Sequence, residues 1–325
     1  MKQKSRWIIP ALIGAALAGP VAAADEITVL STVTRVVNLP MIVGLRLLEK
    51  QDGVKVNMKD LRSPESVTLA VIDGQGQFGT GFAPFYPAIE KGAGIKGIME
   101  LSRPEFVIMA KKEIANVQGL NGVRLASHSP KSTVQSLVHF YLSTRPGIQP
   151  NVVFIPEGSP ARASALLRGA VDAAAFDLSS AQVVDASAPG KFHTLVDFTG
   201  EPISSSTLMV NSAYAAKNPE LVRKVVLRLV ESYRRGAADP NFWVRERGDA
   251  LKEIDDAKLE TQLRSIVKIM DRDGGLERMR GKGATENIAF QVAAENLSAP
   301  ASKWKAEQFF DTRPLEAALK ELARK

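Results

Sequence analysis

The sequence predicts an α/β protein with mainly parallel, doubly wound sheets. The first observation is an alternation of short apolar runs with segments of helical spacing, from Ile27 to about Arg235, which is typical of βαβ units. The second is a Ser-Pro or Asn-Pro pair at the start of several helical segments. The third is a weak internal repeat, which suggests that the chain contains two similar lobes.

Short apolar runs bounded by polar residues and turn formers are the candidate strands. They are Ile27–Val33, Val54–Met58, Gln77–Gly79, Gly97–Leu101, Phe106–Ala110, Val123–Ala126, Val152–Ile155 and Ala173–Phe176. The helical segments between them are Met41–Lys50, Glu65–Asp73, Phe85–Lys91, Lys131–Ser143, Ala161–Arg168 and Leu178–Ser187. Beyond Pro219 only amphipathic helices are expected, over Glu220–Arg235, Ala257–Arg272, Glu286–Asn296 and Leu315–Arg324.

The pairs Ser63-Pro64, Ser129-Pro130, Ser159-Pro160 and Asn218-Pro219 mark helix starts. A Ser or Asn side chain at the N-cap accepts an unpaired backbone N–H, and Pro fits the first helical position. Two of these pairs also carry the internal repeat. Ser63-Pro64 and Ser159-Pro160 are each followed by a short helix, a glycine (Gly74 or Gly169) and a strand.

The N-terminal residues read as a secretory signal. Lys2, Lys4 and Arg6 precede the apolar run Ile8–Ala18, and Ala22-Ala23-Ala24 gives the small-residue pattern of a cleavage site before Asp25. The apolar run is too short and too interrupted for a membrane anchor, which needs about 20 residues. We therefore expect residues 1–24 to be removed and the protein to be periplasmic.

The composition excludes several classes of function. The chain has no cysteine, so disulfides, Cys nucleophiles and thiolate metal sites are excluded. The formal charge of +7 falls to about +4 without the three cations of the signal, and the remaining Lys and Arg are scattered. Nucleic-acid binding is not expected, because it requires a basic cluster on one face. Nothing in the composition calls for a cofactor.

Motifs for catalysis are also missing. Gly74–Gly79 has the spelling of a dinucleotide-binding loop, but it leads from a helix into a strand, which is the reverse of the required order. The histidines His128, His139 and His193 are far apart and have no carboxylate at metal-ligand spacing. No serine occupies a nucleophile elbow. We expect a binding protein and no enzyme.

Segments spread over nearly the whole chain resemble one family. Asn38–Val43 looks like its first helix and Gly79–Pro84 like its third strand end. Gly119–Arg124 is similar to its transition to the second lobe, with Asn121 and Val123 where Lys is commoner. Ser129–Thr133 matches its helix start, and Ala165–Ala174 matches its "A-L-x-x-G-x-x-D-A" segment. The chain thereby resembles the solute-binding proteins of the sulfonate, nitrate and thiamine-precursor type (NMT1/THI5-like, SsuA/TauA-like).

The resemblance implies a periplasmic-binding-protein type II fold, with two doubly wound lobes joined by two crossings and a helical C-terminal extension on lobe I. Lobe I would comprise residues 25–106 and 206–325, and lobe II residues 107–205. The implied function is capture of a small molecule for an ABC permease in the inner membrane, by a monomer. An exported sensor for a membrane kinase and a thiamine-pyrimidine-synthase-like enzyme are the alternatives.

Ligands of open α/β sheets bind at the carboxyl ends of the strands. This rule selects Thr32, Arg35, Asn38, Thr80, Gly81, Phe82 and Ser102 in lobe I, and Ser129, Lys131, Ser132, Thr133, Glu157, Gly158 and Asp177 in lobe II. The first helical turn after Ser129 should attract an anion through free N–H groups and the helix dipole. Arg35 could pair with a carboxylate or sulfonate.

Other side chains near the cleft leave the ligand class open. Phe82, Phe85 and Tyr86 could form an apolar wall, and Arg162 could reach the cleft or form an ion pair with Glu157. The negative charges of Glu157 and Asp177 disfavour a purely anionic ligand. Sulfonates, carboxylates, zwitterions and pyrimidine-like heterocycles therefore all remain candidates.

Overall fold

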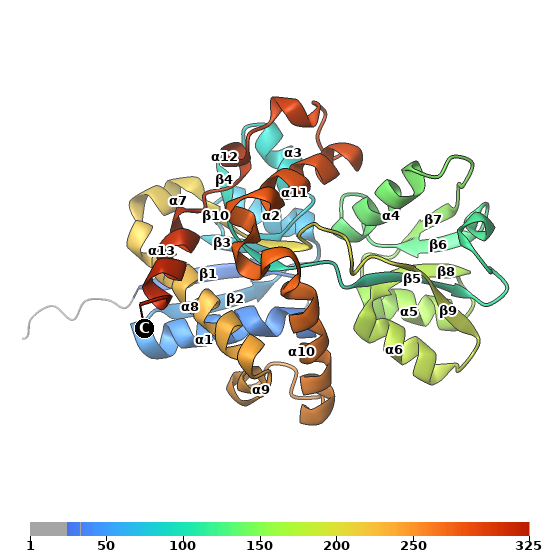
Figure 1. Cartoon of the computed structure of the whole chain (residues 1–325), viewed down its shortest axis with the longest axis horizontal. Coiled ribbons are helices and arrows are strands. Elements are labelled where there is room, and N and C mark those ends of the chain that lie inside the picture. The colour runs from blue at the N-terminus through green and yellow to red at the C-terminus, as the bar shows by residue number, and fades with distance from the viewer. Residues whose placement is uncertain (1–24, 33, 325) are drawn as a thin grey trace, which may run out of the picture.

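The computed structural model describes residues 25–32 and 34–324. The signal peptide expected over residues 1–24 lies outside these residues. Two separate five-stranded sheets, each flanked by helices, form the two halves of the molecule (Figure 1). We call the half around the first sheet lobe I and the half around the second sheet lobe II. Among the described residues, no helix is both long and apolar enough to cross a bilayer.

The sheet of lobe I has the strand order β2-β1-β3-β10-β4. Its strands are β1 (Glu26–Ser31), β2 (Lys55–Asp60), β3 (Phe78–Gly81), β4 (Ile95–Ser102) and β10 (Ser206–Asn211). Strand β1 runs parallel to β2 and β3, whereas β10 is antiparallel to both β3 and β4. The sheet is therefore parallel except for the strand that returns from lobe II.

The sheet of lobe II repeats this plan in the order β7-β6-β8-β5-β9. Its strands are β5 (Phe106–Lys111), β6 (Arg124–Ser127), β7 (Asn151–Phe154), β8 (Ala173–Asp177) and β9 (Phe192–Asp197). Here β5 is the antiparallel strand, and it is the one that enters from lobe I. The chain passes between the sheets through residues 103–105 and returns through residues 198–205.

The matching plans explain the internal repeat in the sequence. The β2-α2-β3 unit of lobe I corresponds to β7-α5-β8 of lobe II, and α2 (Pro64–Ile72) and α5 (Ser159–Leu167) have the same length. Gly74 and Gly169 follow these helices with φ angles of 73° and 72°. Glycine adopts such positive angles without steric cost, so each forms the turn between helix and strand. The two-lobed α/β prediction is confirmed.

Helices cover both faces of each sheet. In the N-terminal part and lobe II they are α1 (Leu39–Asp52), α2, α3 (Phe85–Glu90), α4 (Thr133–Ser143), α5 and α6 (Leu178–Ser187), with 3-10 turns at Val36–Asn38 and Val117–Leu120. The C-terminal part adds α7 (Ser212–Lys217), α8 (Pro219–Ala238), α9 (Asn241–Glu246), α10 (Asp256–Met270), α11 (Lys282–Ala293), α12 (Ala306–Phe309) and α13 (Arg313–Leu322), with 3-10 turns at Arg272–Arg280 and Ala301–Lys303. Most of these C-terminal helices lie on lobe I (Figure 1).

Every strand expected from an apolar run is present, with ends shifted by a few residues. Strands β9 and β10 were not predicted from the sequence. Their sequences, Phe192–Asp197 and Ser206–Asn211, mix polar and apolar residues, and β9 lies at a sheet edge where only one face is well buried. Strand β10, by contrast, is buried between β3 and β4, but its apolar run is limited to Leu208, Met209 and Val210.

The predicted helix starts are only partly correct. Ser63 caps α2 by accepting a hydrogen bond from the Ser66 N–H (3.2 Å). The Ser129 start is wrong: α4 begins at Thr133 and its N-cap is Ser132, which accepts from Gln135 N–H at 3.2 Å. Ser159 is also not a cap, because Gly158 occupies the N-cap position of α5. Asn218 precedes α8, but its side chain makes no cap hydrogen bond.

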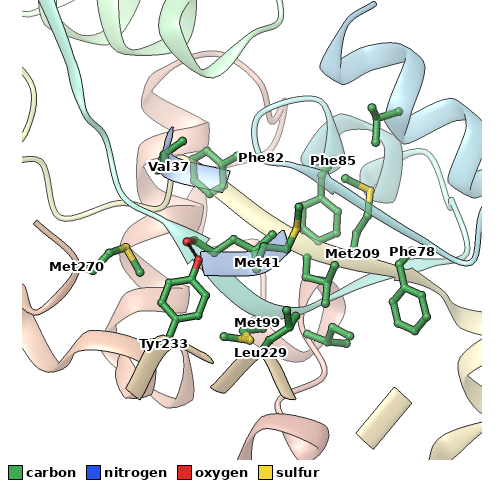
Figure 2. Close-up of a cluster of buried hydrophobic side chains, with 14 of the residues drawn as sticks. Val37, Met41, Phe78, Phe82, Phe85, Met99, Met209, Leu229, Tyr233 and Met270 are labelled. Atoms are coloured by element: carbon green, nitrogen blue, oxygen red, sulfur yellow. Dashed lines mark hydrogen bonds between the residues drawn. The ribbon is translucent and has the colours of Figure 1, made fainter. Parts of the chain in front are cut away.

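The core of lobe I joins the sheet to the C-terminal helices. Figure 2 shows Phe78, Phe82 and Phe85 beside Met41 and Met209 in one buried cluster. The hydroxyl of Tyr233 on α8 donates a hydrogen bond to the Leu101 carbonyl at the end of β4. The last strand before the first crossing is therefore tied to the C-terminal part of the chain, which keeps lobe I one packed unit.

Candidate functional site

A cavity of about 340 Å³ lies between the lobes, close to the two crossing segments. Lobe I contributes Thr32, Arg35, Asn38, Arg62, Pro64, Thr80, Gly81 and Phe82. Lobe II contributes His128, Ser132, Thr133, Val134, Pro156, Glu157, Gly158, Ser159 and Arg162, and the crossing strands add Phe106, Ser205 and Ser206. Such a volume lies in the range typical of small-molecule sites.

The topology explains why these residues meet. Loops that follow β1 and β3 in lobe I, and β6 and β7 in lobe II, leave the carboxyl ends of parallel strands. Both sheets turn these ends toward the space between the lobes, which is where open α/β sheets form their binding crevices. Local sequence selected the loops, and the two crossings bring them to a common cavity.

Most of the side chains selected from the sequence line this cavity. They are Thr32, Arg35, Asn38, Thr80, Gly81, Phe82, Ser132, Thr133, Glu157 and Gly158. Their contact with a ligand stays a prediction. Of the proposed aromatic wall, only Phe82 lines the cavity; Phe85 and Tyr86 are buried in the core of lobe I.

Ser129 and Lys131 are not among the residues that line the cavity. The Ser129 hydroxyl instead donates to Glu65 Oε1 (2.8 Å) on α2, so it links the two lobes. Lys131 is exposed and borders a separate cavity of about 130 Å³ between α4 and residues 294–296. The sequence misplaced both because it started the helix too early.

Ser102 and Asp177 are also not among the lining residues. The Ser102 hydroxyl shares a hydrogen bond of 2.8 Å with the hydroxyl of Ser205, across the two crossings. Asp177 is the N-cap of α6 and accepts from the Ser180 N–H at 2.8 Å. Each of these two side chains forms a hydrogen bond within the protein, so we do not count it among the polar groups open to a ligand.

Arg35 lines the cavity, but its charge already has partners. Its Nη1 lies 3.0 Å from Glu105 Oε1 and 3.6 Å from Asp177 Oδ2. Its guanidinium group also lies over the ring of Phe106, 5.7 Å from the centroid. Burial raises the pKa of the Glu105 carboxyl to about 8, although the charge of Arg35 acts in the opposite direction. This cluster joins both lobes and a crossing segment.

Arg162 is the cation of the cavity that lacks an acidic partner. Its side chain is nearly fully buried, with 1% of the residue exposed. Its nitrogens donate to the carbonyls of Ala175 (2.6 Å) and Ile155 (3.1 Å) and to the Ser159 hydroxyl (3.0 Å). In the described part of the chain it forms no ion pair, so of the two alternatives for Arg162 the pair with Glu157 is wrong, and the position at the cleft is the one found.

Burial lowers the pKa of Arg162 to about 10, with a smaller contribution from the nearby charge of Arg35, while Asp177 acts in the opposite direction. The side chain is therefore still a cation at neutral pH. A buried cation without an ion pair is unfavourable, because its carbonyl and hydroxyl acceptors and the more distant charge of Asp177 compensate it only in part. The cavity thus presents a positive charge that an anion would stabilise.

Two helix N-termini add to this positive potential. The first residues of α4 (Thr133 and Val134) and of α5 (Ser159) all line the cavity. Within the described residues, the backbone N–H groups of Thr133 and Val134 have no protein acceptor. Free N–H groups and the helix dipole favour an anion at such a place.

His128 lies at the end of β6 and borders the same space. Burial lowers its pKa to about 4, and the charge of Arg162 acts in the same direction. The imidazole is therefore neutral at pH 7. Its Nδ1 lies 3.1 Å from the Ser129 hydroxyl. A neutral ring can offer a ligand one hydrogen-bond donor or acceptor without adding charge.

At the edge of the cavity Arg62 Nη2 lies 3.6 Å from Glu157 Oε1. Arg62 precedes α2 in lobe I and Glu157 precedes α5 in lobe II, so this pair also spans the cleft. Both side chains are mostly exposed, at 82% and 54%. Glu157 therefore already has a cationic neighbour, and the acids near the cavity are matched by arginines.

Comparison with protein families identifies the chain. The family model described as NMT1/THI5 like matches residues 50–241. The chain belongs to the NMT1/THI5-like family. No curated protein sequence matches it. The family resemblance seen in the sequence is thereby confirmed.

Solved structures show the same fold. A protein from Bordetella bronchiseptica superposes on this NMT1/THI5-like chain with a TM-score of 0.74, 16% identity, and coverage of 92% of this chain and 98% of its own. The nitrate-binding protein NrtA from Synechocystis superposes with a TM-score of 0.72 and 10% identity, and the match covers 93% of this chain and 90% of NrtA. The alkanesulfonate-binding protein SsuA from Xanthomonas axonopodis, bound to MOPS, superposes with a TM-score of 0.64 and 17% identity, and the match covers 85% of this chain and 96% of SsuA. The periplasmic-binding-protein fold is confirmed.

Sequence reasoning missed Arg62, Phe106 and His128 as cavity residues of this NMT1/THI5-like protein, and it left open whether Arg162 reaches the cleft. His128 follows β6 directly, so the strand-end rule itself could have selected it. Arg162 gave a weaker signal, because an arginine in the first turn of a helix is usually exposed. Its burial depends on carbonyl groups from β8 and the end of β7, which only the folded chain supplies.

Proposed function

We propose that the protein is the solute-binding component of an ABC-type importer and captures a small anion between its lobes. The buried, unpaired charge of Arg162 carries this proposal, together with the free N–H groups at the start of α4. The family and the fold of sulfonate-binding and nitrate-binding proteins agree with it. We infer that the protein acts in the periplasm as a monomer, docks to a membrane permease and does no chemistry on its ligand.

The pairing of charges favours a plain anion over a zwitterion. Glu157 lies beside Arg62, and Glu105 and Asp177 lie beside Arg35. A cationic ligand group would have to displace one of these arginines, whereas an anionic group would gain Arg162 directly. The walls formed by Phe82, Phe106 and Val134 suit an apolar or aromatic body attached to the anion.

The volume limits the size of the ligand. The volume of about 340 Å³ lies near the lower end of the range for small-molecule sites, which is about 300–1,000 Å³. Small carboxylates and sulfonates with a short chain or a single ring satisfy this limit. Pyrimidine-like heterocycles are of similar size, but without a negative charge they would leave Arg162 uncompensated.

The test is a binding titration of residues 25–325 with alkanesulfonates, aryl carboxylates, nitrate and neutral pyrimidines, combined with product analysis to detect turnover. A ligand at about 100 times its Kd stabilises a protein by about 2.7 kcal/mol, so thermal shifts can screen the panel first. We expect an anion to bind without turnover. Binding of neutral pyrimidines alone, or conversion of the ligand, would contradict the proposal.

Arg162→Gln tests the residue that carries the proposal. Loss of a hydrogen bond from a charged group costs about 1.5–3 kcal/mol, which corresponds to roughly a tenfold to hundredfold rise in Kd. Arg168→Gln is the matched control, because Arg168 lies at the end of the same helix, where its guanidinium donates a hydrogen bond to the Ser164 hydroxyl. Equal affinities of the two variants would remove Arg162 from the site.

A further inference from the structure

A further contact between the lobes lies where α11 faces α4 (Figure 1). The ring of Phe290 on α11 stacks on Phe82, with centroids 6.4 Å apart and planes at 25°. On its other side Phe290 meets Phe140 of α4 at 5.3 Å in an edge arrangement. Phe82 lines the cavity, so this row of rings connects the cavity wall to lobe II.

Next to these rings a buried hydrogen bond crosses between the lobes. Asn296 Nδ2 donates to Ser136 Oγ on α4 and to Gln291 Oε1 on α11, both at 2.8 Å. Asn296, Ser136 and Gln291 are all buried. Glu295 has a φ angle of 56°, which is uncommon for a residue with a side chain. This turn ends the helical segment and directs Asn296 to α4.

The segment from α11 to Ser298 is held by lobe I. Ser298 donates from its N–H (2.8 Å) and its hydroxyl (2.6 Å) to Glu90 Oε1 on α3. Asn287 accepts from the Ser204 N–H at 2.8 Å, beside the start of β10. The segment is therefore anchored to lobe I, although its side chains Phe290 and Asn296 contact α4 of lobe II.

We propose that Phe290 and Asn296 are positioning residues that favour the closed arrangement of the lobes and thereby set ligand affinity from outside the cavity. The first turn of α4 supplies the free N–H groups of Thr133 and Val134, and Ser136 lies one turn further along the same helix. A hinge motion that withdraws α4 must break the Asn296–Ser136 hydrogen bond and expose the rings of Phe140 and Phe290. The α11–α4 contact therefore raises the population of the state that binds.

The affinity of a ligand falls with the fraction of protein in its binding-competent state. Weakening the α11–α4 contact should therefore raise Kd without removing any group that touches the ligand. The effect on Kd rests on the proposed binding function. The effect on the ligand-free equilibrium between open and closed lobes does not, because it depends only on the contact between α11 and α4.

The experiment measures lobe separation directly. Because the chain contains no cysteine, Lys59→Cys in lobe I and Lys191→Cys in lobe II, both exposed, can carry a pair of spin labels. We expect Asn296→Ala and Ser136→Ala to shift the ligand-free distance distribution toward the open state. Loss of one neutral hydrogen bond should raise Kd by about threefold to tenfold, with an unchanged distance at saturation.

Controls separate the possible failures. Ser143→Ala removes a hydroxyl from the end of α4 that bonds only to the Phe140 carbonyl, so it should change neither quantity. The double variant Asn296→Ala/Ser136→Ala should have no more effect than Asn296→Ala alone, because the hydrogen bond to Ser136 is already lost in that variant. Phe290→Ala provides an independent variant if one of these fails to fold.

An unchanged distance distribution in all these variants would overturn the proposal, even if an anion binds tightly. A shifted distribution in a protein that binds no anion would support the role of the contact and reject the proposed function. A shifted distribution with a higher Kd for the anion would support both.

Discussion

Arg35 Nη1 lies 3.0 Å from Glu105 Oε1 and thereby connects the loop after β1 to the segment that crosses into lobe II. The two residues are 70 positions apart in the sequence. Asp177 of lobe II lies 3.6 Å from the same nitrogen, so the cluster responds to the relative position of the lobes. The buried carboxyl group of Glu105 also gives the protein a pH dependence.

Glu105 should make stability fall as the pH rises. Burial raises its pKa to about 8 in the folded protein, against about 4.3 in an unfolded chain. Between these values the folded state holds the extra proton, so this stabilising contribution is complete below about pH 4 and is lost as the pH approaches 8. Relative to Glu105→Gln, the wild type should lose up to about 1.4 kcal/mol for each pH unit in this window. Urea unfolding of the wild type and Glu105→Gln from pH 5 to pH 9 measures their difference in unfolding free energy. A difference that stays constant over this pH range would contradict the prediction.

Ser132→Ala should destabilise the protein by about 1 kcal/mol, because Ser132 is the N-cap of α4. Ser129→Ala should cost less, since its hydroxyl bonds to Glu65 and caps no helix. Chemical denaturation of both variants and of the control Ser143→Ala checks the order. If Ser129→Ala were the more damaging cap variant, α4 would begin where the sequence pattern placed it.

Gly236→Ala should be destabilising although it replaces a glycine within a helix. Alanine usually stabilises a helix by about 1 kcal/mol relative to glycine. Here a Cβ would overlap the indole ring of Trp243, which is buried against α8. Overpacking of this kind costs about 1–3 kcal/mol. Gly94→Ala is the control, because open space surrounds that position. Thermal unfolding should show a clearly lower melting temperature for Gly236→Ala and little change for Gly94→Ala.

Arg62→Ala should change ligand affinity by less than about fivefold. Its pair with Glu157 is exposed, and exposed ion pairs contribute only about 0–1 kcal/mol. The expected contrast with Arg162→Gln distinguishes a cation at the edge of the cavity from one inside it. A tenfold loss in the same titration would mean that Arg62 contacts the ligand and that the anion lies further out.

The sequence predicted the architecture well because the signals for it are local. Runs such as Ala173–Phe176 and the spacing of Ala161–Arg168 depend on which faces are buried in each element. The edge strand β9 was missed because its alternating residues do not form an apolar run. The start of α4 was misplaced for a related reason: Ser129-Pro130 and Ser132 are both acceptable caps, and only the packed helix distinguishes them.

The loops around the cavity were also predictable, because strand order and direction follow from the βαβ pattern and fix where the strand ends lie. The sequence by itself therefore determined the fold class, the two lobes and half of the residues that line the cavity. Only the tertiary structure decided which charges remain available. Arg35 lies beside the carboxylate of Asp177 and donates a hydrogen bond to Glu105, whereas Arg162 is buried among carbonyl groups. The balance of burial and partners sets the energy of a charge, and these partners come from segments that are distant in the sequence.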